Sequence, residues 1–455
     1  MEHLDQQERD QIWEKIQEAL MNEQIDQFRA EFLELHPYDQ AKIFENQDEY
    51  IRFLIYSYLS PEEVADVIEQ VDSELVEAFI LEMNPTYASH VLAEMSTDDA
   101  VDILNHFDKN KVASFLTIME KDSANEIKAL LHYEEKTAGS IMTTEFVVVQ
   151  INQTVKEAMR HLRKEAPDAE TIYYTYVVDA NKRLAGVISL RDLIIAEGDW
   201  LISDVMSDRV VSVQVGEDQE EIAQMMRDYD FLALPVVDFQ NHLLGIITVD
   251  DVMDVMEQEA SDDYSKLAGI SLADRSDDNP ISSARKRLPW LVILLFLGMF
   301  TASIIGRFEE TLDEVAILAI FIPLIAGMAG NTGTQALAVA VRSIATGEFE
   351  KQGKASIIIR EAFTGLITGT SCGIIITLVV FVWKGDFFLG LLVGFSIMAT
   401  LIVATIAGAV VPIIMHRLNI DPAVASGPFI TTINDIISIL IYLGMATAFM
   451  NLLIH

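Results

Sequence analysis

The sequence predicts a multi-domain membrane protein: an α-helical N-terminal domain with a superhelical arrangement, a duplicated α+β region, a connecting helix, and an all-α membrane domain of five spans. Three observations lead to this prediction. Charge is separated along the chain, two regions are internally duplicated, and long apolar stretches fill the C-terminal part. The predicted boundaries are 1–136 for the N-terminal domain, 137–255 for the duplicated region, 249–270 for the connecting helix, 271–284 for a linker and 285–455 for the membrane domain.

Negative charge is concentrated in the first part of the chain. The 455 residues include 31 Lys and Arg and 70 Asp and Glu, which gives a formal net charge of -39. From Arg285 onward acidic and basic residues cancel at ten each, so the whole net charge precedes that residue. Such a region repels nucleic-acid phosphates, and it can attract divalent cations or simply remain soluble.

The cysteine content, the absence of catalytic motifs and the start of the chain limit the kinds of protein that the sequence can encode. Cys372 is the one cysteine, which excludes an internal disulfide and a Cys-rich metal site. The nine His residues form no ligand motif, and no phosphate-cradling loop is present, so we do not expect an enzyme. The polar start MEHLDQQERD is not expected to be a signal peptide.

The predicted N-terminal domain contains a repeat with an offset of 36 residues. The segment LSPEEVADVI at 59–68 matches MSTDDAVDIL at 95–104. We interpret each unit as a helix pair in which Ser60 and Ser96 are N-caps at equivalent positions. Stacked helix pairs bury each other's apolar faces and form a small superhelix.

The repeat also places acidic residues at equivalent positions. Asp66 in the first unit corresponds to Asp102 in the second, and Asp98 lies four residues before Asp102 on the same helix face. A solvated acidic surface is the simpler explanation of such a pair, and a cation site is the alternative.

The second duplication has an offset of 59 residues. The segment at 176–194 matches the segment at 235–253, and each predicts strand, turn, strand and the start of a helix. Both copies keep a Gly, two hydrophobic residues, Ser or Thr, and then Asp three residues later. This double pattern resembles a tandem pair of CBS domains.

The CBS resemblance implies an adenine nucleotide site, in which the signature Asp holds ribose hydroxyls. The residues implicated are Ser189, Arg191 and Asp192 in the first copy and Thr248 in the second. The alternative is that Ser189 and Thr248 only cap the helices that follow them.

Five apolar stretches are each long enough to cross a bilayer, near 288–306, 315–341, 356–383, 387–415 and 424–453. Lys and Arg residues precede the first span and lie in or beside the loops between spans two and three and between spans four and five. These positions are all on the same side of the membrane as the acidic N-terminal region. The positive-inside rule therefore predicts a cytoplasmic N-terminus and an outside C-terminus in the cell membrane.

Asp435 lies inside the fifth apolar stretch, where a carboxylate is costly unless something compensates its charge. Gly427 and Thr431 precede it at four-residue intervals, so the three share a helix face that can line a polar path. Asn331 lies in a second cluster of small and polar residues, PLIAGMAGNTGTQ. A proton, an intramembrane Arg such as Arg360, or a bound cation are the three ways to compensate Asp435.

Taken together, these motifs resemble the MgtE family of magnesium channels over essentially the whole chain. The resemblance is most specific in PLIAGMAGNTGTQ, DPAVASGPFITTIND and ITVDDVMDVMEQEASDDYSKLAGI. It implies a homodimer with one pore on the two-fold axis, where Asp435 forms the ion-selecting site. Asp421 matches a second ion-contacting position at the cytoplasmic entrance.

The resemblance also implies that cytosolic Mg²⁺ bridges acidic surfaces and closes the pore, with the connecting helix as a plug, and that ATP is a possible CBS ligand. A proton-coupled solute transporter and a non-conducting sensor of divalent ions are the alternatives. The implied regulatory ligands are Asp66, Asp98 and Asp102, then Glu220 and Asp230, and on the connecting helix Asp251, Asp254, Glu259, Asp262 and Asp263.

Overall fold

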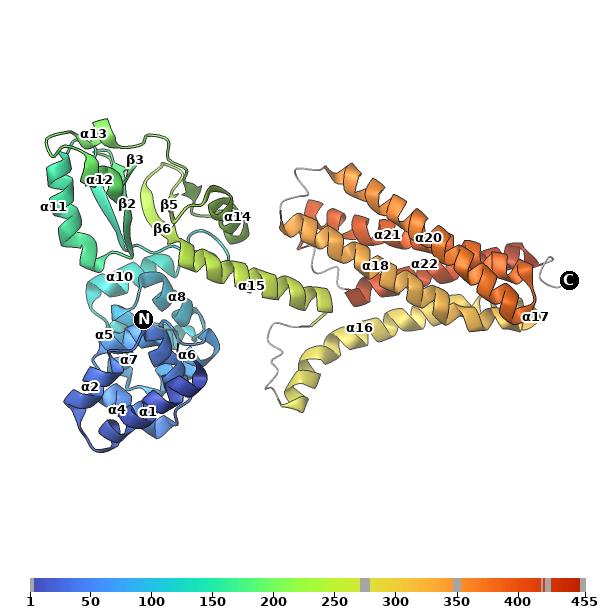
Figure 1. Cartoon of the computed structure of the whole chain (residues 1–455), viewed down its shortest axis with the longest axis horizontal. Coiled ribbons are helices and arrows are strands. Elements are labelled where there is room, and N and C mark those ends of the chain that lie inside the picture. Colours follow the sequence, from blue (N-terminus) through green and yellow to red (C-terminus); the bar gives the residue numbers. More distant parts are fainter. Residues whose placement is uncertain (1–3, 271–278, 347–352, 419, 422–426, 451–455) are drawn as a thin grey trace. The chain divides into compact units, whose positions relative to one another are not determined.

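The computed structural model describes residues 4–270, 279–346, 353–418, 420–421 and 427–450 (Figure 1). The chain divides into two compact units, Met1–Met256 and Glu257–His455, which are described separately below. The first unit holds the helical domain and the duplicated region. The second holds the end of the connecting helix and the apolar helices.

Short helices build the N-terminal domain, as the sequence predicts. From α2 to α10 the helices begin at intervals of twelve residues. Their bounds are α1 (Gln6–Met21), α2 (Ile25–Phe32), α3 (Pro37–Glu45), α4 (Glu49–Tyr58), α5 (Pro61–Ile68), α6 (Ser73–Glu82), α7 (Pro85–Glu94), α8 (Thr97–Asn105), α9 (Lys109–Ile118) and α10 (Lys121–Leu130).

The interpretation of the repeat as a helix pair is wrong. An offset of 36 residues covers three helices, so that α5, α6 and α7 correspond to α8, α9 and α10. The third helix of each unit escaped notice because PTYASHVLAE and KDSANEIKAL share almost no residues. Helices two apart along the chain pack together, as α3 does with α5 and α5 with α7, and this stacking gives the domain a continuous core.

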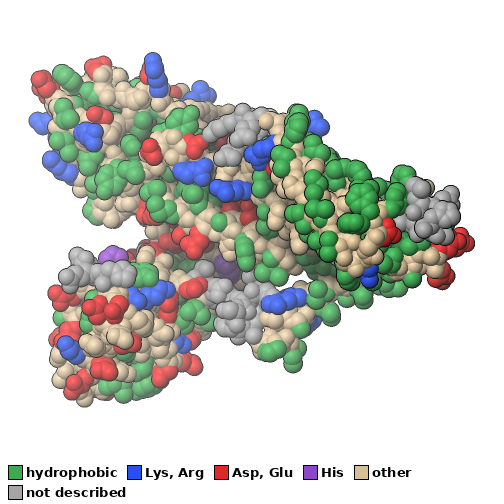
Figure 2. Space-filling model, turned by 45° about the vertical axis from the view of Figure 1, so that its right-hand side comes forward, with side chains coloured by type: hydrophobic (Ala, Val, Ile, Leu, Met, Phe, Trp, Pro, Cys, Tyr) green, Lys and Arg blue, Asp and Glu red, His purple; other side chains and the backbone are tan. Residues whose placement is uncertain are grey.

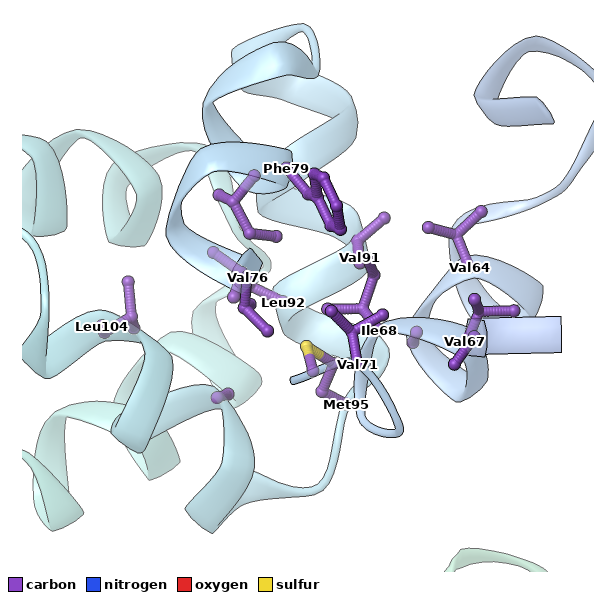
Figure 3. Close-up of a cluster of buried hydrophobic side chains, with 14 of the residues drawn as sticks. Val64, Val67, Ile68, Val71, Val76, Phe79, Val91, Leu92, Met95 and Leu104 are labelled. Atoms are coloured by element: carbon purple, nitrogen blue, oxygen red, sulfur yellow. The ribbon is translucent and has the colours of Figure 1, made fainter. Parts of the chain in front are cut away.

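Aliphatic side chains form much of the core of these stacked helices, together with Phe79 and Met95 (Figure 3). Val64, Val67 and Ile68 come from α5, and Val91 and Leu92 come from α7; all five side chains are at most 2% exposed. Burial of apolar area is the main stabilising term for helices of eight to ten residues, which are too short to be stable alone.

The duplicated region forms two three-stranded sheets, which confirms the predicted strand–turn–strand–helix order. In each sheet the first two strands are parallel and the last two antiparallel. The first sheet contains β1 (Phe146–Gln150), β2 (Thr171–Val178) and β3 (Leu184–Ser189), with helices α11 (Val155–Glu165), α12 (Leu190–Ile195) and α13 (Ile202–Val205); the second contains β4 (Val213–Gln214), β5 (Ala233–Val237) and β6 (Leu243–Thr248), with α14 (Gln219–Tyr229).

Helix α15 (Val249–Ala268) follows β6 directly and confirms the predicted connecting helix. Its residues up to Met256 belong to the first unit and the rest to the second. The helix therefore joins the two units covalently, without an intervening turn.

Among the described residues, five helices are long and apolar enough to span a membrane. Residues 271–278 of the predicted linker lie outside the described residues. The prediction of a linker up to 284 is wrong, because Asn279 caps a helix that begins at Pro280. Hydrophobic side chains cover much of the surface of this unit (Figure 2). The helices are α16 (Pro280–Gly306), α18 (Ile322–Ala345), α20 (Lys354–Lys384), α21 (Phe387–Arg417) and α22 (Gly427–Ala448), with the short α17 (Glu309–Glu314) and a 3₁₀ segment (Ala316–Phe321) before α18.

Candidate ion site

Asp435 lies near the middle of α22 and is half-buried against α18. A Cβ atom added at Gly330 of α18 would stand 3.8 Å from Asp435 Oδ1 and 3.2 Å from Thr431 Cγ2. The glycine therefore lets the two helices approach closely beside the carboxylate. This close approach of small residues is typical of helix packing in membranes.

No basic side chain in the described part of the chain forms an ion pair with Asp435, whose carboxyl group is half-buried. Of the three ways to compensate the charge, Arg360 does not serve within the described part of one chain, because it pairs with Glu361 at 3.4 Å instead. A proton and a cation remain.

The other predicted pore residues have different surroundings. Gly427 is buried at the start of α22, where an added Cβ would stand 3.3 Å from the Leu267 carbonyl of α15. The Thr431 hydroxyl donates to the Pro428 carbonyl at 2.8 Å, which leaves its methyl group against Gly330. Asn331 is exposed on α18 in the single chain.

The end of α15 packs against the beginning of α22 within the second unit. Leu267 packs against a small cluster that includes Ile430 and Leu337. Gly269, at a φ of +71°, approaches Trp290 of α16 so closely that a Cβ there would lie 2.8 Å from the indole nitrogen. The predicted plug helix is thus attached where α22 begins.

Lys266 reinforces this attachment, and the sequence alone did not single it out. Its ammonium donates to Asp262 at 2.8 Å and also pairs with Asp421, which lies 155 residues away in sequence. Burial opposes the charge, but hydrogen bonds to both carboxylates raise the pKa of Lys266 overall. Two predicted metal ligands therefore share a basic side chain in this structure.

The neighbouring Asp263 is an acid of the same surface. Burial, followed by the charge of Asp421, raises the pKa of Asp263 to about 6. Glu259 is partly exposed one turn earlier. Asp254 is exposed on the part of α15 that belongs to the first unit.

In the first unit, acids gather where α8 meets the duplicated region. The Ser96 hydroxyl donates to Glu170 and the Thr97 hydroxyl to Glu145, both at 3.1 Å, while the Ser96 amide donates to Glu69 at 2.8 Å. None of these three glutamates was predicted, because each comes from a different element and no local pattern marks it.

Asp98 and Asp251, which were predicted, belong to this acidic junction. Asp98 is 8% exposed, and its Oδ1 is buried without a hydrogen-bond partner in the described residues. Burial first, and the charge of Asp251 second, raise the pKa of Asp98. Burial also raises the pKa of Asp251 to about 7 and that of Asp99 to about 8.

The remaining predicted acids are not brought together in one chain. Asp66 and Asp102 are exposed on α5 and α8. Glu220 is in the first turn of α14 and Asp230 caps its end, so about 15 Å of helix separates them. Within the described ranges no three acidic, His or Cys side chains are grouped so as to hold a metal ion.

The first CBS signature forms the helix cap that was the simpler explanation. Ser189 accepts from the Asp192 amide, and its hydroxyl donates to the Asp192 carboxylate at 2.6 Å. In the second signature, the hydroxyl and the amide of Thr248 both donate to the Asp251 carboxylate. Asp192 and Arg191 are exposed, whereas Asp251 is partly buried in the acidic junction. The signature of the first copy is therefore more accessible to a ligand than that of the second.

Comparison with known proteins gives consistent matches along the chain. Residues 322–445 match a family of divalent cation transporters, MgtE, residues 35–136 match the MgtE intracellular N domain, and residues 138–199 and 202–258 match CBS domains. A magnesium transporter MgtE from Enterococcus faecalis is 50% identical over 98% of each chain, and one from Thermus thermophilus is 37% identical over 95% of this chain and 97% of its own.

Two solved structures are similar to about half of the chain. The soluble part of a magnesium transporter is 51% identical, with a TM-score of 0.54, and covers 56% of this chain and 100% of its own. The cytosolic domain of the Mg²⁺ channel MgtE in complex with ATP is 39% identical, with a TM-score of 0.50, over 53% of this chain and 98% of its own.

Proposed function

Because the chain belongs to the MgtE family of magnesium transporters, a family of multi-pass membrane transporters rather than enzymes, we propose that it is a Mg²⁺-selective channel. It works as a homodimer with one pore on the two-fold axis and admits Mg²⁺ down its electrochemical gradient. The orientation places the N-terminus in the cytoplasm and the C-terminus outside, in agreement with the basic residues that flank the spans.

Asp435 carries this proposal. A half-buried membrane carboxylate without a basic partner in its own chain needs a counter-charge from elsewhere. Two copies bring two such carboxylates to the axis, where they repel unless a divalent cation lies between them. Mg²⁺ dehydrates reluctantly and keeps several waters, so the paired carboxylates hold it through those waters.

The pore is closed by cytosolic Mg²⁺ that binds between acidic surfaces. The unpartnered Asp98 Oδ1 beside Asp251 fits a cation, because carboxylate oxygens are the ligands that Mg²⁺ prefers. The described residues of one chain do not group three such ligands, so closure brings acids together from separate surfaces or from both subunits. Low Mg²⁺ leaves the carboxylates repelling each other and favours the open state. The other acids that serve this role are Asp66, Asp102, Glu220, Asp230, Asp254, Glu259, Asp262 and Asp263.

ATP shifts the same equilibrium through the CBS pair. The relative solved with ATP supports this step. In this chain the exposed Asp192 and Arg191, beside Ser189, form the more accessible of the two signatures, whereas Thr248 holds Asp251 within the acidic junction.

The test is replacement of the ion-site carboxylate by its neutral isostere. We expect Asp435→Asn to abolish Mg²⁺ current in patches of reconstituted protein while the dimer remains intact by size-exclusion chromatography. Asp386→Asn is the matched control, since Asp386 caps α21 through its side chain and Asn caps equally well.

Each alternative predicts a different result. A proton-coupled transporter shows flux that follows a pH gradient, and a non-conducting sensor shows no current in the parent protein. Normal Mg²⁺ current in Asp435→Asn would contradict the proposal.

A further inference from the structure

Asn434, the residue before Asp435, has a buried amide in the membrane interior. Asn434 is 1% exposed. Neither the nitrogen nor the oxygen of its side-chain amide has a hydrogen-bond partner among the described residues. A buried polar group without a partner destabilises the fold more than an apolar side chain of that size. Such a group calls for a specific explanation.

The amide of Asn434 occupies the space that a side chain at Gly333 would fill. A Cβ at Gly333 would overlap the Asn434 amide nitrogen and would stand 3.0 Å from its Cγ and 3.2 Å from Ile430 Cγ2. On another side of α18, a Cβ at Gly408 of α21 would stand 3.1 Å from the Leu337 amide and 2.9 Å from Ala336 Cβ. Helix α18 is therefore closely packed against both α21 and α22 at this level.

Gly330, three residues before Gly333 on α18, receives Thr431 and approaches Asp435 Oδ1. The two glycines thus contact neighbouring parts of α22, one beside the carboxylate and one beside the amide. Successive residues of an α-helix are about 100° apart around its axis. A side chain held in the Gly333 notch consequently fixes the direction in which Asp435 points.

We propose that Asn434 is a positioning residue for Asp435: its amide, seated in the notch at Gly333, sets the rotation of α22 and thereby the geometry of the ion site. This inference rests on the proposed function, which gives Asp435 its role. Asn434 itself faces the interior of the protomer and does not contact the ion.

The experiment uses the full-length protein and four variants. Gly333→Ala places a methyl group where the amide lies, Asn434→Ala empties the notch, and the double variant lets the new methyl fill it. Gly327→Ala is the matched control, because a Cβ at Gly327 on the same helix meets no atom within 4 Å. The readouts are Mg²⁺ current, the Mg²⁺-to-Na⁺ permeability ratio from reversal potentials, and thermal stability.

We expect Gly333→Ala to lower the permeability ratio about tenfold, which corresponds to about 1.4 kcal/mol. Asn434→Ala lowers it less, the double variant recovers most of the parental ratio, and Gly327→Ala leaves it unchanged. If Gly333→Ala does not fold, Asn434→Ala decides the question, because it introduces no clash.

Two results would overturn the inference. One is a permeability ratio in folded Gly333→Ala, or in Asn434→Ala, equal to that of Gly327→Ala. The other is a double variant as impaired as the sum of its parts. An absence of Mg²⁺ current in the parent, or its persistence in Asp435→Asn, contradicts the proposed function instead. In that case cross-linking tests the inference separately. The rate at which a bis-thiol reagent cross-links Asp435→Cys is measured with and without Gly333→Ala, in a protein whose Cys372 is replaced by Ala. We expect Gly333→Ala to change this rate, and an unchanged rate would show that Asn434 does not orient position 435.

Discussion

Two serines at equivalent places in the N-terminal repeat have different roles. Ser60 forms a capping box with Glu63, in which each side chain bonds to the other residue's backbone amide. Ser96 was also expected to cap its helix, but its side chain makes no cap hydrogen bond. Its hydroxyl donates to Glu170 instead. The same residue type therefore stabilises a helix in one unit and a contact between domains in the other.

Substitution of each serine separates these roles. We expect Ser60→Ala to lower the free energy of unfolding by about 1 kcal/mol, the usual cost of losing an N-cap. Ser96→Ala removes no cap and therefore shifts the denaturation midpoint less. The measurement is urea unfolding of residues 1–270. The control is Ser57→Ala, since Ser57 is an exposed residue of α4. Equal shifts for the two serines would contradict this assignment.

At the scale of elements, α15 is attached to the beginning of α22 by one lysine as well as by apolar packing. Lys266 pairs with Asp262 and Asp421. A tethered ammonium at this position neutralises carboxylates that, in the proposed function, a divalent cation bridges. Under that proposal, attachment of α15 has a component that does not depend on Mg²⁺.

Replacement of this lysine tests that component. We expect Lys266→Met to raise the open probability in the absence of cytosolic Mg²⁺, because the docked helix loses its ion pairs. Closure at high Mg²⁺ persists, since divalent ions bridge the carboxylates. Lys266→Arg keeps the charge and serves as the control in the same patch-clamp titration. An unchanged open probability for Lys266→Met at zero Mg²⁺ would argue against a role for the pair.

The sequence was sufficient to predict the two duplications, the apolar helices and the position of Asp435 inside the last of them, because each rests on local periodicity or on one costly residue. It missed the third helix of each N-terminal unit. It was not sufficient for contacts between distant segments. Lys266 and Asp421 are 155 residues apart, and the glutamates of the acidic junction come from separate elements. In the sequence, Gly333 is one of many small residues in the apolar stretches. Only the structure shows that the Asn434 side chain of α22 lies against it.

At the scale of the whole molecule, the large negative charge is not all exposed. Part of it lies in the acidic junction, where burial raises the pKa of Glu69 to about 7, of Asp251 to about 7 and of Asp99 to about 8. Unfolded carboxylates titrate near pH 4. The folded first unit therefore binds more protons than the unfolded chain between about pH 4 and pH 8.

This difference fixes the sign of the pH dependence. Stability contributed by the protonated junction is complete below the unfolded pKa values and is lost as pH rises through the folded ones. We expect residues 1–270 in chelator to unfold at lower urea concentration as pH rises from about 5 to about 8. Added Mg²⁺ restores stability at the higher pH. The slope becomes smaller in Asp99→Asn but not in Asp122→Asn, an exposed acid on α10; equal slopes would contradict the prediction.

The twelve-residue spacing of helix starts limits how the length of the N-terminal domain can change. A deletion of 61–96 removes α5, α6 and α7 and joins the end of α4 to α8 through the same kind of junction, with Thr97 in the place of Pro61. A deletion whose length is not a multiple of twelve breaks the spacing of the helix starts that follow it. We therefore expect the domain to tolerate gain or loss of a whole 36-residue unit better than a change that is not a multiple of twelve residues.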